Sequence, residues 1–176
     1  MNQANSIPNQ NKEVVSTFLN LLLADEYVLY TKTRAAHWNV DGSNYFELHV
    51  FLENQFNRLD YMIDEIAEQI RSLGFFVSGS LKDFMSIAQM NDDHDNYRDS
   101  KEIFEKLRND HDTIIRVIKH EIHPISKKLK DPNTALFISG LMEQHQKMAW
   151  MLRFFMSNPE FNKEIQIQKA NNQLVI

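Results

Sequence analysis

The chain has 176 residues, of which 43% are hydrophobic and 24% charged, a composition that favours one domain large enough to bury its own core. It contains no cysteine, which excludes disulfides and thiolate metal sites, so a bound metal needs His, Asp or Glu ligands. No segment reaches the ~18 consecutive apolar residues of a membrane helix, and the polar N-terminus lacks the apolar core of a signal peptide. We therefore expect a soluble, cytoplasmic protein without a membrane partner.

Hydrophobic residues recur at helical spacing through most of the chain, and only 4 Gly and 4 Pro interrupt it. This pattern predicts an all-α fold with long helices over residues 11–38, 43–73, 95–122 and 132–157. A shorter helix over 81–88 is indicated by Ser80 and Asp83, which resemble a capping box. It lies in a connection too long for a simple link between neighbouring helices. Four long helices with one long crossover between the second and third describe a ferritin-like four-helix bundle.

The ends of the predicted helices carry their own signals. Gly74 is a natural stop just past the second long helix, and Asp131 with Pro132 forms the pattern of an N-cap followed by the first helical residue. We expect residues 1–10 to be a disordered N-terminal tail and 159–176 to be a C-terminal tail. The bundle then occupies residues 11–158 as a single domain.

The second long helix carries four candidate metal ligands. They form two pairs with a spacing of four residues: His49 with Glu53, and Asp64 with Glu68. At ~100° per residue, all four fall within one stripe of the helix surface. Imidazole together with carboxylate suits iron and similar divalent metals. The competing interpretation is that the carboxylates form an ordinary solvated face and that the histidine is structural.

Distance along the helix divides these four residues into two half-sites. His49 and Asp64 are 15 residues apart, or ~22 Å at 1.5 Å per residue, too far for one metal ion to bridge. If two copies of the helix pack antiparallel about a two-fold axis, facing positions have residue numbers with a constant sum. That sum is 117 for His49 with Glu68 and also for Glu53 with Asp64. One register thus assembles both half-sites and gives two equivalent centres per dimer.

The sequence around these ligands resembles the Dps proteins, mini-ferritins also known as DNA-binding proteins from starved cells. The resemblance extends from about residue 11 to 157 and rests on HWNVDG at 37–42, on the four spaced ligands, and on AWMLR at 149–153. It implies a ferritin-like fold and a hollow homo-oligomeric shell of twelve subunits. It also implies oxidation of Fe(II), typically by hydrogen peroxide, and storage of Fe(III) mineral inside. The chain lacks the Glu-x-x-His pairs of bundles that hold two metals within one subunit.

The family pattern divides the ligands of each centre between two subunits: His37, His49 and Glu53 from one, Asp64 and Glu68 from its two-fold mate. Each intersubunit centre is expected to take two iron ions, cycling between Fe2+ and Fe3+. In the family the aromatic residue after the first histidine, here Trp38, sits beside the centre and absorbs oxidising equivalents, although simple packing is the alternative. The remaining histidines, among them His111 and His145, are expected to be surface or core residues rather than a second metal site.

The main alternative function is DNA compaction, in which the shell binds the chromosome through basic tails. The formal net charge is −5, residues 1–18 contain one Lys and one Glu, and residues 160–176 contain two Lys and two Glu. Neutral tails do not supply the cationic charge that phosphate binding needs. A bundle without metal function is a third possibility, against which the complete ligand set counts. We therefore predict a ferroxidase that protects DNA indirectly and binds it weakly or not at all.

Overall fold

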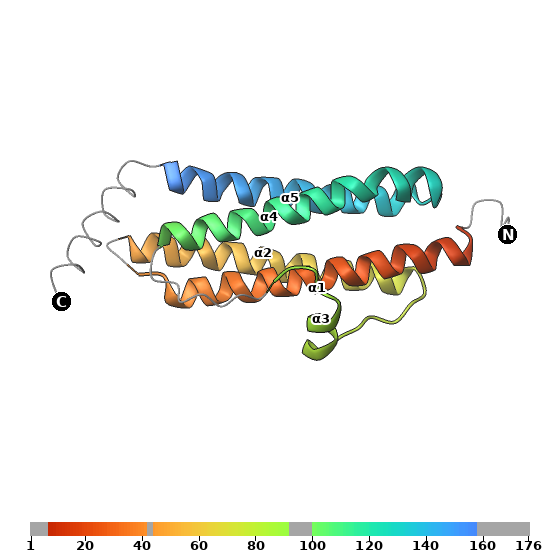
Figure 1. Cartoon of the computed structure of the whole chain (residues 1–176), viewed down its shortest axis with the longest axis horizontal. Helices are drawn as coiled ribbons and strands as arrows, with labels where there is room; N and C mark the ends of the chain where they lie inside the picture. Colours follow the sequence, from red (N-terminus) through yellow and green to blue (C-terminus); the bar gives the residue numbers. More distant parts are fainter. Residues whose placement is uncertain (1–6, 42–43, 92–99, 158–176) are drawn as a thin grey trace.

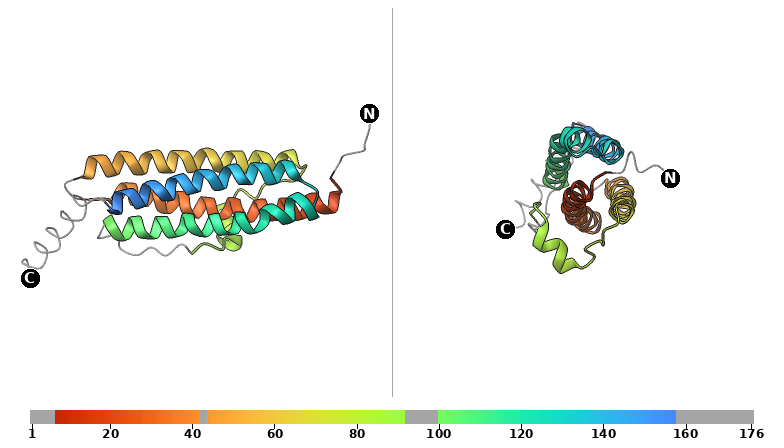
Figure 2. Two further views of the ribbon diagram at one scale, coloured as in Figure 1. Left: turned by 90° about the horizontal axis from the view of Figure 1, so that it is seen from above. Right: turned by 90° about the vertical axis from the view of Figure 1, so that its right-hand side faces the viewer.

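The computed structural model describes residues 7–41, 44–91 and 100–157. In these ranges it contains four long helices: α1 (Asn9–Asn39), α2 (Tyr45–Ser72), α4 (Ser100–His123) and α5 (Pro132–Ser157). Figure 1 shows them running along one axis, with α1 beside α2 and α4 beside α5. The short helix α3 (Leu81–Ile87) lies outside the four in the end-on view of Figure 2 and packs against α1. The expected all-α, ferritin-like bundle with an extra helix in the crossover is confirmed.

Several helix boundaries differ from the predictions. Helix α1 begins at Asn9, directly after Pro8, so the residues assigned to the N-terminal tail include its first two residues. The predicted start of the third long helix at residue 95 falls outside the described residues. A π-helical turn, η1 (Pro124–Lys128), follows α4 where a plain connection was expected. Pro124 has no N–H to donate, so the α-helical ladder is interrupted there and the wider turn continues the chain.

The local signals at the helix ends act as predicted. Ser80 Oγ accepts the N–H of Asp83 at 3.1 Å and so caps α3. Gly74 follows α2 with φ of 98°, a left-handed conformation that favours glycine. Asp131 caps α5 because its Oδ1 accepts the N–H of Thr134 at 3.0 Å and its Oδ2 accepts the Thr134 hydroxyl at 2.6 Å.

Apolar side chains from the two helix pairs form one core between them. The fully buried members include Leu22, Leu29, Leu52, Leu59, Met62, Ile66, Ile118 and Ile138. Burying each such side chain stabilises the fold by roughly 1.5–3 kcal/mol. Among the helices of the described residues, none combines the length and the apolar character that crossing a bilayer requires.

Three ionisable side chains cross this core and join α1, α4 and α5; we call them the core triad. Glu26, His111 and His145 are each at most 1% exposed. His145 Nε2–H donates to Glu26 Oε1 at 2.6 Å, and the Nδ1 atoms of the two histidines lie 2.9 Å apart, so one donates to the other. Burial lowers the pKa of His111 well below its usual 6.5, and the adjacent His145 adds to the effect. His111 is therefore neutral near pH 7.

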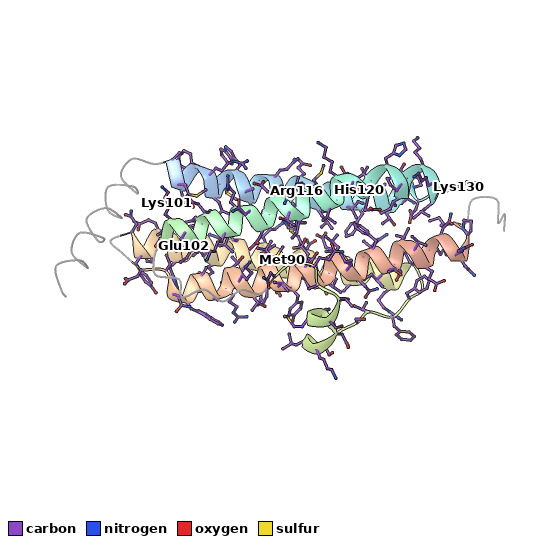
Figure 3. The ribbon with its side chains drawn as sticks, in the orientation of Figure 1. Met90, Lys101, Glu102, Arg116, His120 and Lys130 are labelled. Atoms are coloured by element: carbon purple, nitrogen blue, oxygen red, sulfur yellow. The ribbon has the colours of Figure 1, made fainter. Side chains whose placement is uncertain are left out.

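Polar side chains on α1 hold the crossover in place. Asp25 Oδ1 accepts the N–H groups of Gln89 and Met90 at 2.7 and 2.8 Å, and Met90 is labelled in Figure 3. Burial raises the pKa of the Asp25 carboxyl, while these two hydrogen bonds oppose the rise. Lys32 Nζ donates to the backbone carbonyl of Asn91 in the crossover at 3.3 Å and also pairs with Asp110 of α4 at 2.5 Å. These contacts fix the path of the crossover without drawing on the stripe of candidate ligands on α2.

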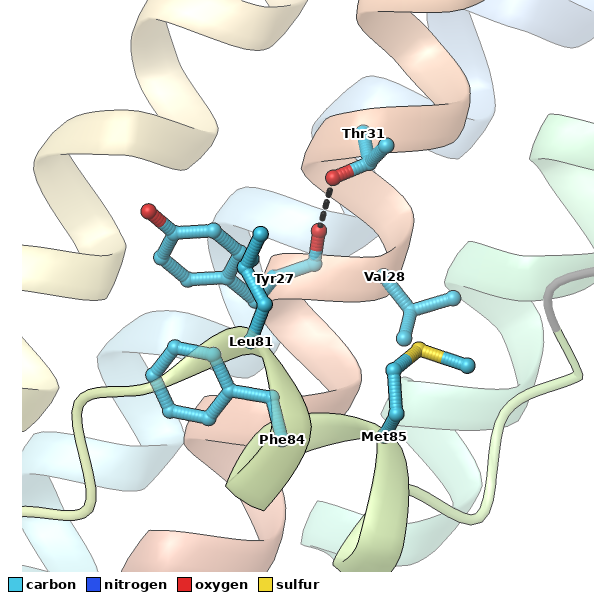
Figure 4. A pocket seen from close by; sticks show the side chains of 6 residues that line it. All are labelled: Tyr27, Val28, Thr31, Leu81, Phe84 and Met85. Carbon is cyan, nitrogen blue, oxygen red and sulfur yellow. Dashed lines mark hydrogen bonds between the residues drawn. The ribbon is translucent and has the colours of Figure 1, made fainter.

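An apolar groove of about 200 Å³ lies between α1 and α3 (Figure 4). It is lined by Tyr27, Val28, Thr31, Leu81, Phe84 and Met85. The Thr31 hydroxyl donates to the backbone carbonyl of Tyr27 at 2.9 Å, so its only proton is already engaged. Because the lining contains neither carboxylate nor imidazole, the groove does not suit a metal ion.

Candidate metal centre

The end of α1 and the start of α2 bring two histidine rings face to face. The ring centroids of His37 and His49 are 3.7 Å apart and the rings are inclined by 27°. His37 Nδ1 lies 2.9 Å from the carbonyl oxygen of His49, and His49 Nδ1 lies 3.0 Å from the carbonyl oxygen of His37. A carbonyl oxygen only accepts, so each Nδ1 carries the proton and donates it. In the neutral rings each Nε2 keeps its lone pair, the form in which imidazole binds a metal.

Two further aromatic rings bracket this histidine pair. Phe56 meets the His37 ring edge to face, with centroids 5.1 Å apart and planes at 73°. Tyr45 stacks on the outer side of the pair, 5.1 Å from the His49 ring and inclined by 30°. His37 is only 8% exposed, whereas Tyr45 is 44% exposed. The rings thus hold both imidazoles in one orientation and leave Tyr45 at the surface.

The candidate carboxylates Glu53, Asp64 and Glu68 are all exposed on α2. Because α2 is unbroken from Tyr45 to Ser72, the predicted stripe is preserved and Asp64 lies ~22 Å along the helix from His49. Within the described ranges, none of the three carboxylates forms an ion pair with Lys or Arg. The stripe is therefore available to a cation or to another subunit.

One chain does not complete a metal site. Among the residues that the structure describes, no three His, Asp or Glu side chains come together to hold an ion. His37 and His49 meet, with Glu53 one turn further along α2, while Asp64 and Glu68 remain at the other end of the helix. This arrangement is what two half-sites require.

Trp38 does not pack in the core of the single chain. Its side chain is 63% exposed, and the guanidinium carbon of Arg34 lies 5.5 Å from its ring centroid. In the single chain, Trp38 therefore does not have the buried packing that was its alternative role. Its expected place beside the centre stays a prediction that depends on a second subunit.

Comparisons with known proteins agree with this architecture. A family model described as a ferritin-like domain matches residues 17–160. An uncharacterized low temperature-induced protein of Nostoc sp. is 34% identical over 149 residues, covering 85% of this chain and 83% of the relative. The DNA protection during starvation protein 2 of Bacillus anthracis is 30% identical over 148 residues, covering 84% and 99%.

A solved structure of another protein has a similar fold. The DPS protein from Vibrio cholerae O1, described as a member of a broad superfamily of ferritin-like diiron-carboxylate proteins, superposes with a TM-score of 0.80. It is 25% identical, and the match covers 89% of this chain and 100% of that one. Fold and family model together define a ferritin-like four-helix bundle. Within that class, the chain belongs to the Dps family.

Proposed function

We propose that the protein is a cytoplasmic ferroxidase that stores iron. It binds Fe(II) at centres shared by two subunits, oxidises it preferentially with hydrogen peroxide, and keeps the Fe(III) mineral inside a shell of twelve subunits. Membership of the Dps family supports iron storage and protection from oxidative damage in general. The observation that carries the proposal is the reciprocal His37–His49 pair, which engages both Nδ1 atoms and so leaves Nε2 of each ring as the nitrogen that can bind a metal, beside an exposed stripe of carboxylates.

The proposed dimer packs two α2 helices antiparallel, with the two-fold axis at the level of Arg58 and Leu59. Near the axis, the exposed Asn57 faces the partner subunit's Asp60, so an amide that can donate meets a carboxylate that can accept. This register keeps the two Asp60 carboxylates from opposing each other. The centre of the interface is therefore complementary without any metal.

The ends of the same interface are different. There Glu53 faces the partner subunit's Asp64, and His49 faces the partner's Glu68. Three carboxylates gathered at one place repel each other and become costly as the interface excludes water. A divalent cation removes that cost, and the imidazoles supply neutral nitrogen ligands. Charge thus favours Fe(II) at each end of the dimer interface.

Two Fe(II) ions per centre match the chemistry of peroxide. Each ion supplies one electron, and together with two protons the pair reduces one hydrogen peroxide to two waters without releasing a radical. Asp64 and Glu68 provide most of the charge for the first ion, with His37 and His49 as its nitrogen ligands. Glu53 serves the second, weaker ion.

Anaerobic titration with Fe(II), followed by a measured pulse of peroxide, tests this function directly. We expect saturable binding of two Fe(II) at each centre. We also expect one peroxide to be consumed for every two Fe(II) oxidised. Dioxygen supplied in place of peroxide should oxidise the bound iron more slowly. Oxidation no faster than that of free Fe(II) in the same buffer would contradict the proposal.

We predict weak or no binding to duplex DNA at physiological salt. The formal net charge of the chain is −5. On α4, His120, which is labelled in Figure 3, is paired with Glu121 at 2.8 Å. A gel-shift assay at ~0.15 M salt is the check, because lower salt exaggerates surface electrostatics. Tight, sequence-independent retardation under these conditions would support the DNA-compacting alternative instead.

A further inference from the structure

The register of the proposed dimer pairs one further position at each of its ends. Phe46, in the first turn of α2, and Arg71, in its last turn, also have residue numbers that add to 117. Phe46 lies 18 residues, or about five turns, before Asp64. Arg71 lies the same number of residues after Glu53. Both side chains therefore belong to the ligand stripe, and the register places Arg71 opposite Phe46 of the partner subunit.

A single chain cannot bring these two side chains together. They are 25 residues apart on an unbroken helix, roughly 37 Å at 1.5 Å per residue. Phe46 is 72% exposed, so its ring lies largely uncovered in the single chain. An exposed apolar ring gains free energy when a neighbouring molecule covers it. The ring and the guanidinium thus need a second copy of the chain to meet.

The end of α2 already holds Arg71 in a position to receive a ring. The Gly74 N–H donates to the Arg71 carbonyl at 3.0 Å, and the Phe75 N–H donates to the Ile70 carbonyl at 3.3 Å; together they form a Schellman motif. This motif turns the chain back, so that Arg71 Nη1 donates to the Phe75 carbonyl at 2.9 Å. The guanidinium carbon also lies 4.5 Å from the centre of the Phe76 ring. Because Arg71 is exposed, the other face of its planar guanidinium is open to a second ring.

The same contacts keep the guanidinium away from a candidate ligand. Glu68 precedes Arg71 by three residues, a spacing at which opposite charges on a helix attract each other. Within the described residues no ion pair joins them, and the guanidinium is turned toward the Phe75 carbonyl and the Phe76 ring instead. An arginine paired with Glu68 would neutralise the carboxylate that Fe(II) needs, and the attraction grows as an interface excludes water. The position of the guanidinium therefore decides whether Glu68 is available.

We propose that Arg71 is held between its own Phe76 and Phe46 of the partner subunit, and that this clamp keeps Glu68 available to Fe(II). This role rests on the proposed ferroxidase function. The face of an aromatic ring attracts a guanidinium, and the attraction is stronger where water is excluded. Each dimer has two clamps, one beyond each metal centre. Phe and Arg are long side chains, which suits the ends of the interface, where two crossing helices are furthest apart.

Cross-linking tests the contact between subunits without iron. The chain has no cysteine, so only introduced ones react. In the full-length protein with Phe46→Cys and Arg71→Cys, a short bis-maleimide reagent should give covalent dimers on a denaturing gel. In each single variant the two cysteines of a dimer are roughly 37 Å apart, so the reagent should leave monomers. Absence of covalent dimers from assembled shells of the double variant, or an equal yield from a single variant, would overturn the inference.

A rescue experiment tests what the clamp does. Anaerobic titration with Fe(II) compares wild type, Phe46→Leu, Arg71→Gln and the double variant, all as assembled shells. Phe46→Leu removes the outer ring and frees the guanidinium to pair with Glu68, so Fe(II) should bind roughly 10-fold more weakly. Adding Arg71→Gln should restore binding, because no cation then competes for the carboxylate. Tyr61→Leu is the control, since it removes an exposed ring of α2 whose cation, Arg58, belongs to the same chain at 5.0 Å.

The outcomes separate the clamp from the ferroxidase function. Unchanged Fe(II) binding in Phe46→Leu, or no recovery when Arg71→Gln is added, would overturn the clamp while wild type still binds and oxidises iron. Equal weakening in Tyr61→Leu would also count against it, because loss of any exposed ring would then suffice. If wild type itself binds no Fe(II), the ferroxidase proposal fails, and the cross-links alone decide the contact between Phe46 and Arg71.

Discussion

Replacing Asp64 and Glu68 together with alanine should slow peroxide-dependent oxidation of Fe(II) by at least about 100-fold, because each centre loses two of its carboxylate ligands. Both side chains are exposed on α2, so the substitution should change the free energy of unfolding by no more than ~0.5 kcal/mol per site. Stopped-flow absorbance of Fe(III) formation measures the rate. Light scattering first establishes that the variant assembles like wild type.

A matched control removes the same charge from the same helix. Glu47 and Glu65 lie on α2 outside the ligand stripe, and their spacing places both on one other face of the helix. Their joint replacement with alanine should leave the oxidation rate close to that of wild type. Equal slowing in both double variants would mean that overall charge, and not ligation by Asp64 and Glu68, controls the rate.

Mixed shells distinguish a shared centre from one within a single chain. One parent carries His37→Ala and His49→Ala, and the other carries Asp64→Ala and Glu68→Ala; each alone should be inactive. In a mixed dimer one centre receives both intact half-sites and the other receives neither. Random mixing should therefore restore about a quarter of wild-type activity, since half of the dimers are mixed and each has one intact centre of two. No recovery in well-mixed shells would contradict the shared centre.

The long helices could be predicted because their information is local. Leu48, Leu52, Leu59 and Ile66 recur at helical spacing and are all buried, so a single stretch of sequence indicates both the helix and its inward face. Gly74 and Asp131 mark helix ends by backbone chemistry that needs no distant partner. The π-helical turn after α4 depends on how Pro124 is accommodated by surrounding structure, which spacing does not reveal.

The histidine pair shows where sequence reasoning stopped. Spacing along α2 indicated His49, and the family resemblance added His37. Neither indicated that each Nδ1 would donate to the other residue's carbonyl, because that contact depends on the path of the chain between α1 and α2. The stack of Tyr45 on His49 was readable in principle, since residues four apart on a helix are neighbours. Because Tyr45 is neither a carboxylate nor an imidazole, the pattern of metal ligands did not predict this stack.

The core triad was missed for a different reason. His145 and Glu26 are 119 residues apart, and no helical spacing relates positions on separate helices. The available signal was Glu26 itself, an acidic residue within the apolar face that Leu22 and Leu29 define on α1. A carboxylate placed there needs a partner from another helix. Knowing which histidine supplies it required the packed bundle.

Replacing His145 with leucine should lower the free energy of unfolding by about 3–5 kcal/mol, because it leaves the Glu26 carboxylate buried without its partner. Both side chains are 0% exposed, and Glu26 Oε2 already lacks a hydrogen-bond partner among the described residues. Because neither side chain reaches the surface of the chain, bulk water does not compensate for the lost bond to Oε1. His111 also loses its hydrogen-bond neighbour at 2.9 Å, which adds to the penalty.

The double variant Glu26→Met with His145→Leu is the decisive comparison. Removing the carboxylate as well eliminates the uncompensated charge and fills the space with apolar atoms, so the double variant should be more stable than His145→Leu alone, although it changes one residue more. Urea unfolding at one protein concentration measures wild type, Glu26→Met, His145→Leu and the double variant, because assembly makes apparent stability depend on concentration. The exposed His120→Leu serves as a surface control. Losses that simply add in the double variant would show that Glu26 and His145 do not act as a coupled pair.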